Sequence, residues 1–134
     1  MTAFQLKIVT PDGIQYDGKA EELVVRTTSG DVGILAGHIN FVAPLGMGEA
    51  VILVEGNKRR GACIGGMVSV VNGSVTLLPT TFEWADQIDL NRAEESENRA
   101  RNVLENKNAS DTEWALAQAR LKRALVRKSV ASRK

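Results

Sequence analysis

Hydrophobic and polar residues follow two different periods along this chain, and the period changes near residue 86. Before that point apolar and polar residues alternate in short segments, as at Phe4, Leu6 and Ile8, which is the period of a half-buried strand. Between the segments stand turn residues, and the pair Asn72 and Gly73 is a strong signal for a tight hairpin turn. The segments expected to form strands are 4–8, 23–25, 32–35, 39–42, 50–54, 62–64, 67–71 and 74–78. Many short strands at close spacing predict a β-sandwich or barrel.

After residue 86 apolar residues recur every three or four positions, which predicts helices. Asp89 is placed to cap a first helix from Leu90 to about Glu105. Ser110 and Glu113 fit a capping box at the start of a second helix. The expected packing residues are Leu90, Ala93, Ala100, Val103 and Leu104 in the first helix and Trp114, Ala117, Leu121, Ala124 and Leu125 in the second.

The predicted fold class is therefore α+β. Residues 1–86 are expected to form a β-sandwich of short antiparallel strands. Residues 87–134 are expected to form an antiparallel hairpin of two helices. The hairpin packs largely through alanine, so we expect it to be marginally stable and able to detach.

The composition changes at the same place. All 12 glycines and all three prolines lie before residue 86, and 134 residues suffice for one domain with an appendage. The content of 43% hydrophobic and 25% charged residues is ordinary for a globular protein. One cysteine, no signal-peptide pattern and no apolar run of about 20 residues predict a reducing, cytosolic setting, with any membrane association made through a partner.

The net charge of +1 conceals an uneven distribution along the chain. Residues 1–85 carry eight acids and six bases, and residues 86–113 carry eight acids and four bases. From Trp114 onward there are seven bases and no acid. Such a segment favours an anionic partner, which could be a nucleotide, a nucleic acid or an acidic protein surface. A solvated basic helix face explains the same pattern.

Arginines of the two predicted helices point to an anion site. If the helices fold back on each other, Arg92 of the first helix converges with Arg123 and Arg127 of the second. Guanidinium groups bind phosphate in a bidentate manner. The alternative is that these arginines form surface ion pairs with nearby carboxylates, which are Asp89, Glu94 and Glu95.

Catalytic and metal-binding patterns are absent from the sequence. The only histidine, His38, has no cysteine or glutamate at metal-ligand spacing, and Ser29 is not in a nucleophile elbow. Gly30, Gly33 and Gly37 lack the lysine and hydroxyl residue of a phosphate-binding loop, so we interpret them as turns. These residues therefore predict no catalytic site and no metal site.

Several motifs occur in a characteristic order. They are Val9 to Gly13, Ser29 to His38, Gly65 to Met67, the hexad Ile88-Asp89-x-x-Arg92-Ala93, and Leu121 to Arg127. In order and spacing they resemble, over nearly the whole chain, the epsilon subunit of bacterial F-type rotary ATP synthases. The hexad is similar to the ATP-recognition motif of the nucleotide-binding members of that family.

The resemblance implies a non-catalytic subunit of the central rotor stalk, on the cytoplasmic face of the bacterial membrane. The sandwich would bind the gamma subunit and the c-ring and so couple proton- or sodium-driven rotation to the catalytic head. The helix pair would extend toward the alpha and beta subunits and inhibit ATP hydrolysis, while ATP bound to the folded hairpin opposes that extension. The basic residues implied in inhibition are Arg120, Lys122, Arg123 and Arg127.

The resemblance also implies individual binding residues. Asp31 would face the c-ring, and Thr10 and His38 would lie near the gamma subunit. No cofactor is required, and whether Mg²⁺ accompanies the regulatory ATP stays open. The residues implied in ATP binding are Glu83, Ile88, Asp89, Arg92, Ala93, Arg99, Arg123 and Arg127.

Two alternatives remain at this point. The chain could be a rotor subunit whose arginines serve inhibition alone, without ATP sensing. It could also be a nucleic-acid-binding module that uses the basic helix, although an aromatic content of 4% leaves little for base stacking. The hexad favours ATP sensing, and no nucleic-acid partner is predicted.

Overall fold

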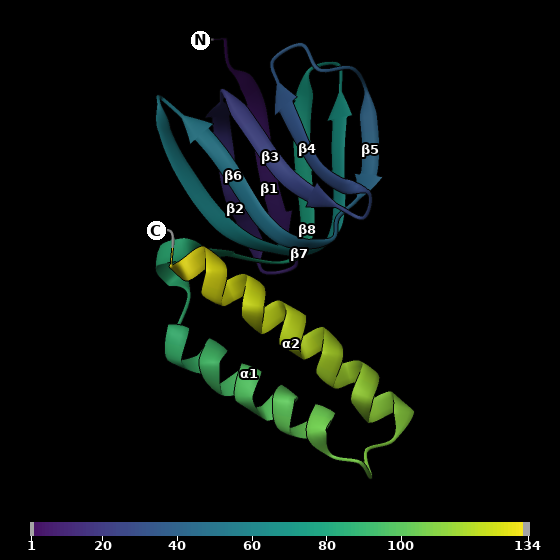
Figure 1. The fold of residues 1–134 in the computed structure, drawn as a ribbon. Coiled ribbons are helices and arrows are strands. Elements are labelled where there is room, and N and C mark those ends of the chain that lie inside the picture. The colour runs from purple at the N-terminus through teal and green to yellow at the C-terminus, as the bar shows by residue number, and fades with distance from the viewer. Residues whose placement is uncertain (1, 133–134) are drawn as a thin grey trace.

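The computed structural model describes residues 2–132, which form a strand-rich domain followed by two long helices (Figure 1). The elements in this range are β1 (Phe4–Thr10), β2 (Gly13–Ala20), β3 (Glu22–Thr27), β4 (Gly30–Leu35), β5 (Phe41–Pro44), β6 (Met47–Val54), β7 (Asn57–Val71), β8 (Ser74–Trp84), the short 3-10 helix η1 (Ala85–Gln87), α1 (Leu90–Glu105) and α2 (Asp111–Ala131). The predicted α+β fold is confirmed.

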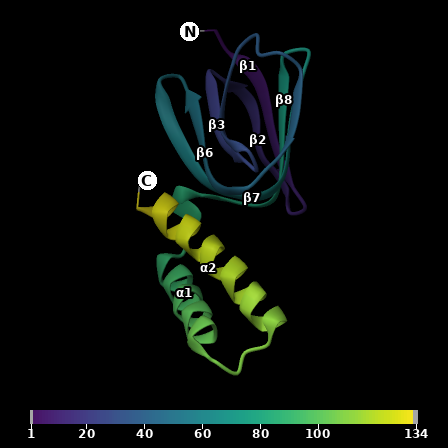
Figure 2. The ribbon, with the colours of Figure 1, turned by 45° about the vertical axis from the view of Figure 1, so that its right-hand side comes forward.

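The strands hydrogen-bond in the order β2-β1-β8-β7-β6-β3-β4, with β5 joined to β7. Strand β7 creates the two layers, because its first half pairs with β6 and its second half pairs with β5. All pairs are antiparallel except β1 with β8, which run parallel. Figure 2 shows the layers from the side, open at the end away from the helices.

The bend in β7 lies at Gly65 and Gly66, which have φ angles of 67° and 99°. A Cβ atom on Gly66 would overlap the carbonyl oxygen of Leu78, so only glycine fits there. The two strands predicted at 62–64 and 67–71 are therefore one continuous strand. That prediction was wrong because the glycines bend the strand without ending it. Gly33 likewise lies inside β4 opposite Val24 and not in a turn.

The sandwich core consists of large aliphatic side chains between the layers. Leu6, Ile8, Leu23, Ile52 and Leu77 have no exposed surface. Each fully buried aliphatic side chain contributes about 1.5–3 kcal/mol through the hydrophobic effect. This core holds the domain together without any contribution from the helices.

The caps predicted for both helices are present. The Asp89 carboxylate accepts a hydrogen bond from the Arg92 backbone N–H at 3.1 Å. The Ser110 hydroxyl accepts from the Glu113 N–H at 3.1 Å, and the Glu113 carboxylate accepts from the Ser110 N–H at 3.3 Å. Because capping is local, these helix starts were readable from sequence.

The helix-to-helix contact is narrower than predicted. Only the alanines Ala93, Ala100, Ala117 and Ala124 of the predicted packing residues are buried. Exposed fractions of 44% for Leu90, 47% for Trp114 and 41% for Leu125 place these side chains outside the contact. The contact is narrower because alanine lets two helix backbones approach closely, and the larger neighbouring side chains then lie on its flanks.

The hairpin meets the sandwich through a small second cluster, here called the docking cluster. Its buried members come from β7, η1, the following linker and the end of α2, with Val126 partly buried beside them: Ala62, Ala85, Ile88, Val130 and Ala131. One ion pair reinforces it, with the Arg127 Nε 2.7 Å from a Glu83 carboxylate oxygen. Most side chains in the cluster are small, so the apolar area that binds the hairpin to the sandwich is modest.

Candidate functional site

A cavity of about 500 Å³ lies where the sandwich meets both helices. We call it the linker cavity because the segment joining β8 to α1 forms one wall. Its lining residues come from the β1–β2 turn, β8, the linker, α1 and α2: Asp12, Thr81, Phe82, Glu83, Gln87, Ile88, Asp89, Arg92, Ala93, Ser96 and Arg127.

The residues of the hexad have distinct roles around this cavity. Ile88 and Ala93 are buried and form an apolar part of its wall. Asp89 caps α1, which places Arg92 on the first turn at the cavity edge. The cap of α1, which depends only on neighbouring residues, therefore positions Arg92 at a cavity that exists only in the folded protein.

A second cavity, of about 530 Å³, runs between α1 and α2. We call it the arginine cavity. It shares Ser96 and Arg127 with the linker cavity, so the two adjoin. Its lining residues are Ser96, Arg99, Ala100, Val103, Glu113, Leu116, Ala117, Arg120, Arg123 and Arg127.

The eight residues implied in ATP binding all line these two cavities. Six of them line the linker cavity: Glu83, Ile88, Asp89, Arg92, Ala93 and Arg127. Arg99 and Arg123 line the arginine cavity together with Arg127. Arg92 and Arg123 thus line different cavities. The three arginines therefore do not all share one cavity as predicted: Arg92 shares the linker cavity with Arg127, and Arg123 shares the arginine cavity with Arg127. Among the described residues, Arg127 is the one arginine that borders both cavities, and Ser96 borders both as well.

The surface ion pairs considered as an alternative do not form among residues 2–132. Arg127 pairs with Glu83 of the sandwich and not with a carboxylate of α1. Four other arginines around the cavities have no carboxylate partner within the described residues: Arg92, Arg99, Arg120 and Arg123. Arg99 donates only to the Ser96 hydroxyl, at 3.4 Å. The site thus presents several uncompensated guanidinium groups.

Sequence reasoning missed some lining residues and misplaced one. Thr81, Gln87 and Ser96 carry no motif and enter the cavities only through folding. Arg120 was assigned to the inhibitory group alone, yet it lines the arginine cavity. Its spacing of three from Arg123 on the same helix face was the signal that could have found it.

A separate ion-pair network joins the two helices on the flank away from the arginine cavity. Glu97 of α1 accepts from the Lys128 ammonium at 2.7 Å and from Arg101 at 2.9 Å. The hydrogen bond from Lys128, aided by Arg101, lowers the pKa of Glu97. The hydrogen bond to Glu97 raises the pKa of Lys128. The network therefore favours the folded hairpin while both groups are charged.

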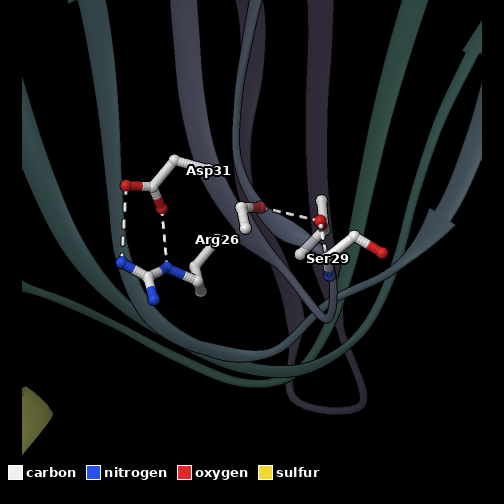
Figure 3. Close-up of polar contacts among 5 residues, drawn as sticks. Arg26, Ser29 and Asp31 are labelled. Atoms are coloured by element: carbon white, nitrogen blue, oxygen red, sulfur yellow. Dashed lines mark hydrogen bonds and ion pairs between the residues drawn. The ribbon is translucent and has the colours of Figure 1, made fainter.

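The three predicted partner-binding residues do not lie together. Asp31 is the second residue of β4 and pairs with Arg26 of β3, with Nε to Oδ1 at 2.7 Å (Figure 3). Thr10 is buried at the end of β1, where its hydroxyl accepts from the Asp12 N–H at 3.2 Å. Both lie at the sandwich end near the helices, whereas His38 lies in the loop after β4 at the opposite end. Their roles stay predictions.

Other chemistry is limited in the described part of the chain. Residues 2–132 contain no group of three or more histidine, cysteine, aspartate and glutamate side chains arranged to hold a metal ion. Burial raises the pKa of the Cys63 thiol to about 12, so this group stays protonated at neutral pH. None of the helices within 2–132 is both long and apolar enough to cross a membrane.

Family models match the chain in two consecutive parts. Residues 3–85 match the beta-sandwich domain of the ATP synthase delta/epsilon chain, and residues 86–132 match its long alpha-helix domain. The chain belongs to the ATP synthase delta/epsilon family. The predicted resemblance is thereby confirmed.

Relatives in this family share much of the sequence. The ATP synthase epsilon chain of Ruminococcus albus is 44% identical over 135 residues, covering 100% of both chains. The epsilon chain of Bacillus pumilus is 41% identical over 133 residues, covering 99% of this chain and 100% of its own. Both relatives carry the name ATP synthase epsilon chain.

Solved structures share the fold at lower identity. A chain of the Euglena gracilis mitochondrial ATP synthase, solved with OSCP, F1 and c-ring, matches with a TM-score of 0.85 at 20% identity. The match covers 100% of this chain and 83% of that one. A chain from the Tetrahymena thermophila mitochondrial ATP synthase central stalk and c-ring matches with a TM-score of 0.66 at 14% identity, covering 95% of each. The delta/epsilon fold is common to all three.

Proposed function

We propose that this chain is a non-catalytic central-stalk subunit of an F-type ATP synthase that also senses ATP. Its sandwich binds the gamma subunit and the c-ring, and so links ion-driven rotation to the alpha/beta head. Its helix pair extends to inhibit ATP hydrolysis, and bound ATP favours the folded pair. The complex places the chain on the cytoplasmic face of the bacterial membrane, attached through its partners.

The observation that carries ATP sensing is the pair of adjoining cavities. Their lining combines β8, the linker, α1 and α2, so the site exists only while the hairpin is folded against the sandwich. Guanidinium groups without carboxylate partners are suited to hold a polyphosphate. The apolar wall at Ile88 and Ala93, beside the carboxylates of Glu83 and Asp89, suits the uncharged end of a nucleotide. A ligand of that kind stabilises the folded hairpin by mass action.

The weak docking of the hairpin makes such control effective. A ligand at ten times its dissociation constant adds about 1.4 kcal/mol, which shifts a balanced equilibrium about tenfold. The two helices have 16 and 21 residues. Placed end to end at 1.5 Å per residue they would span about 55 Å. That length would carry the basic residues of α2 far from the sandwich.

The rotor role has independent support. The relatives are named ATP synthase epsilon chain, and similar folds occur in complexes described as central stalk and c-ring. At the sandwich end opposite the helices, Ile39 is 77% exposed and Val42 is 62% exposed. Exposed apolar side chains of this size are candidates for contact with a partner protein.

ATP sensing is tested by titration calorimetry of the full chain with ATP, with and without Mg²⁺. We expect saturable binding by the wild type and at least about tenfold weaker binding by Arg92→Ala, because a charged hydrogen-bonding group is lost. Lys107→Ala is the matched control, since it also removes one positive charge, while Lys107 lines neither cavity and forms no ion pair with the described residues. An RNA oligomer tests the nucleic-acid alternative.

The outcomes separate the two parts of the proposal. If the wild type does not bind ATP at cellular concentrations, ATP sensing is refuted and the rotor role without sensing stands. The rotor role is tested by copurification with the gamma subunit of the same source. Failure to associate with gamma would refute the rotor role, whatever the calorimetry shows.

A further inference from the structure

Arg120 lies on α2, three residues before Arg123 and seven before Arg127, so the three side chains share one helix face. Of these three arginines it is the farthest along α2 from the docking cluster. It lines the arginine cavity with Arg99 and Arg123 and has no carboxylate partner among the described residues. An exposed guanidinium that lines a cavity and has no counterion is a candidate ligand-binding group.

The two cavities differ in charge. The linker cavity contains three carboxylates against two guanidiniums, one of which is already paired with Glu83. Among residues 2–132, the arginine cavity is lined by four arginines, which are Arg99, Arg120, Arg123 and the shared Arg127. The single carboxylate that this part of the chain places there is that of Glu113, which accepts a hydrogen bond in the α2 cap. The surplus positive charge therefore lies between the helices. A molecule with one weakly charged end and one polyanionic end would match this difference, with its polyanionic end in the arginine cavity.

The arginines of α2 are ordered along the helix axis. With a rise of 1.5 Å per residue, Arg123 lies about 6 Å beyond Arg127, and Arg120 lies about 4.5 Å beyond Arg123. Arg127 borders both cavities, so a phosphate chain that enters from the linker cavity meets Arg127 first and Arg120 last. The number of phosphates therefore decides whether the chain reaches Arg120.

We propose that Arg120 binds the terminal phosphate of a nucleoside triphosphate and thereby makes the site prefer triphosphate over diphosphate. This inference rests on the proposed ATP-binding function and assigns Arg120 a role beyond inhibition. It also makes Arg120 unavailable to an acidic protein surface while a triphosphate is bound. A bound nucleoside diphosphate does not reach Arg120, so this arginine then stays without a phosphate partner.

The test is calorimetry of the full chain with ATP and with ADP, for the wild type, Arg120→Gln and Lys122→Gln. We expect Arg120→Gln to weaken ATP binding by about tenfold or more, the effect of losing a charged hydrogen-bonding group. ADP binding should change by less than about twofold, within the range of ordinary surface substitutions. Lys122→Gln removes one charge from the same helix but lies outside both cavities, so it should leave both affinities unchanged.

Two further measurements keep the result unambiguous. Helix content by circular dichroism shows whether Arg120→Gln still folds, and Arg120→Lys keeps the charge if the glutamine variant does not. Equal weakening of ATP and ADP, or no weakening of either, overturns the role of Arg120 and leaves ATP sensing intact. Absence of ATP binding by the wild type overturns ATP sensing and, with it, this inference.

Discussion

The sandwich and the hairpin are both built from two packed layers, but the side chains at their contacts differ greatly in size. The sandwich buries leucine, isoleucine, valine and phenylalanine, whereas the hairpin buries alanine between its helices and only a small cluster at the docking contact. Because burial energy scales with apolar area, we expect the sandwich to be the more stable part and the hairpin to depend on its attachments. One chain therefore combines a domain with a large apolar core and a helix pair with a small one.

Polar contacts are distributed in the opposite way. Backbone hydrogen bonds join the strands of the sandwich along nearly their full length. The hairpin is joined to the sandwich and to itself by ion pairs, which are Glu83 with Arg127 and Glu97 with Lys128. Ion pairs with partial exposure contribute little and respond to salt, pH and ligands. We therefore expect salt, pH and ligands to affect the attachment of the hairpin more than the stability of the sandwich.

The largest expected effect comes from the sandwich core. Leu77→Ala removes a side chain with no exposed surface and should cost about 2–5 kcal/mol of unfolding free energy, because a cavity remains. Leu78→Ala is the matched control, since this neighbouring leucine is 45% exposed and should cost less than about 0.5 kcal/mol. Urea unfolding followed by circular dichroism measures both. Equal losses would contradict the contrast between core and surface.

A smaller and more local effect is expected at the docking cluster. Val130→Ala removes two methyl groups from a side chain that is 1% exposed, at a cost of about 1–3 kcal/mol. Amide hydrogen exchange should become faster in α2 and stay unchanged in the sandwich strands. Ser129→Ala, an exposed neighbour on the same helix, should leave exchange unchanged. Faster exchange throughout β7 and β8 would show that the two regions unfold together.

The smallest effect concerns the ion pair between the helices. The pKa of Glu97 is lowered in the folded hairpin, so its contribution is present above the ordinary glutamate pKa and disappears as pH falls through the folded value. The pKa of Lys128 is raised, so its contribution is present below the ordinary lysine pKa and disappears as pH rises through the folded value. The pair therefore stabilises the hairpin most between about pH 5 and 10.

Lys128→Met tests this dependence. The variant should show faster amide exchange in α2 near neutral pH and a weaker response to acid and to added salt. Lys107→Met is the control, because Lys107 lies in the loop between the helices and forms no ion pair with the described residues. If Lys128→Met responds to acid as the wild type does, the pair of Glu97 with Lys128 is not the cause of the acid response.

Part of the fold was readable without the structure because it depends on neighbouring residues. The caps at Asp89 and Ser110 and the turn at Asn72 and Gly73 involve groups within three residues of each other. The extent of β7 was not readable, because its bend is tolerated only through contacts with Leu78, twelve residues away from Gly66. Local signals thus located the elements better than they located the ends of the strands.

The candidate site divides in the same way. The sequence by itself determined the break near residue 86, the helix starts and the stripe of Arg120, Arg123 and Arg127, since these follow from composition and helical period. Only the tertiary structure decided that Arg127 pairs with Glu83 and borders two cavities, and that Arg120 lines one of them. The reason is physical: alanine contacts set how closely the helices approach, and the docking cluster sets where they meet the sandwich.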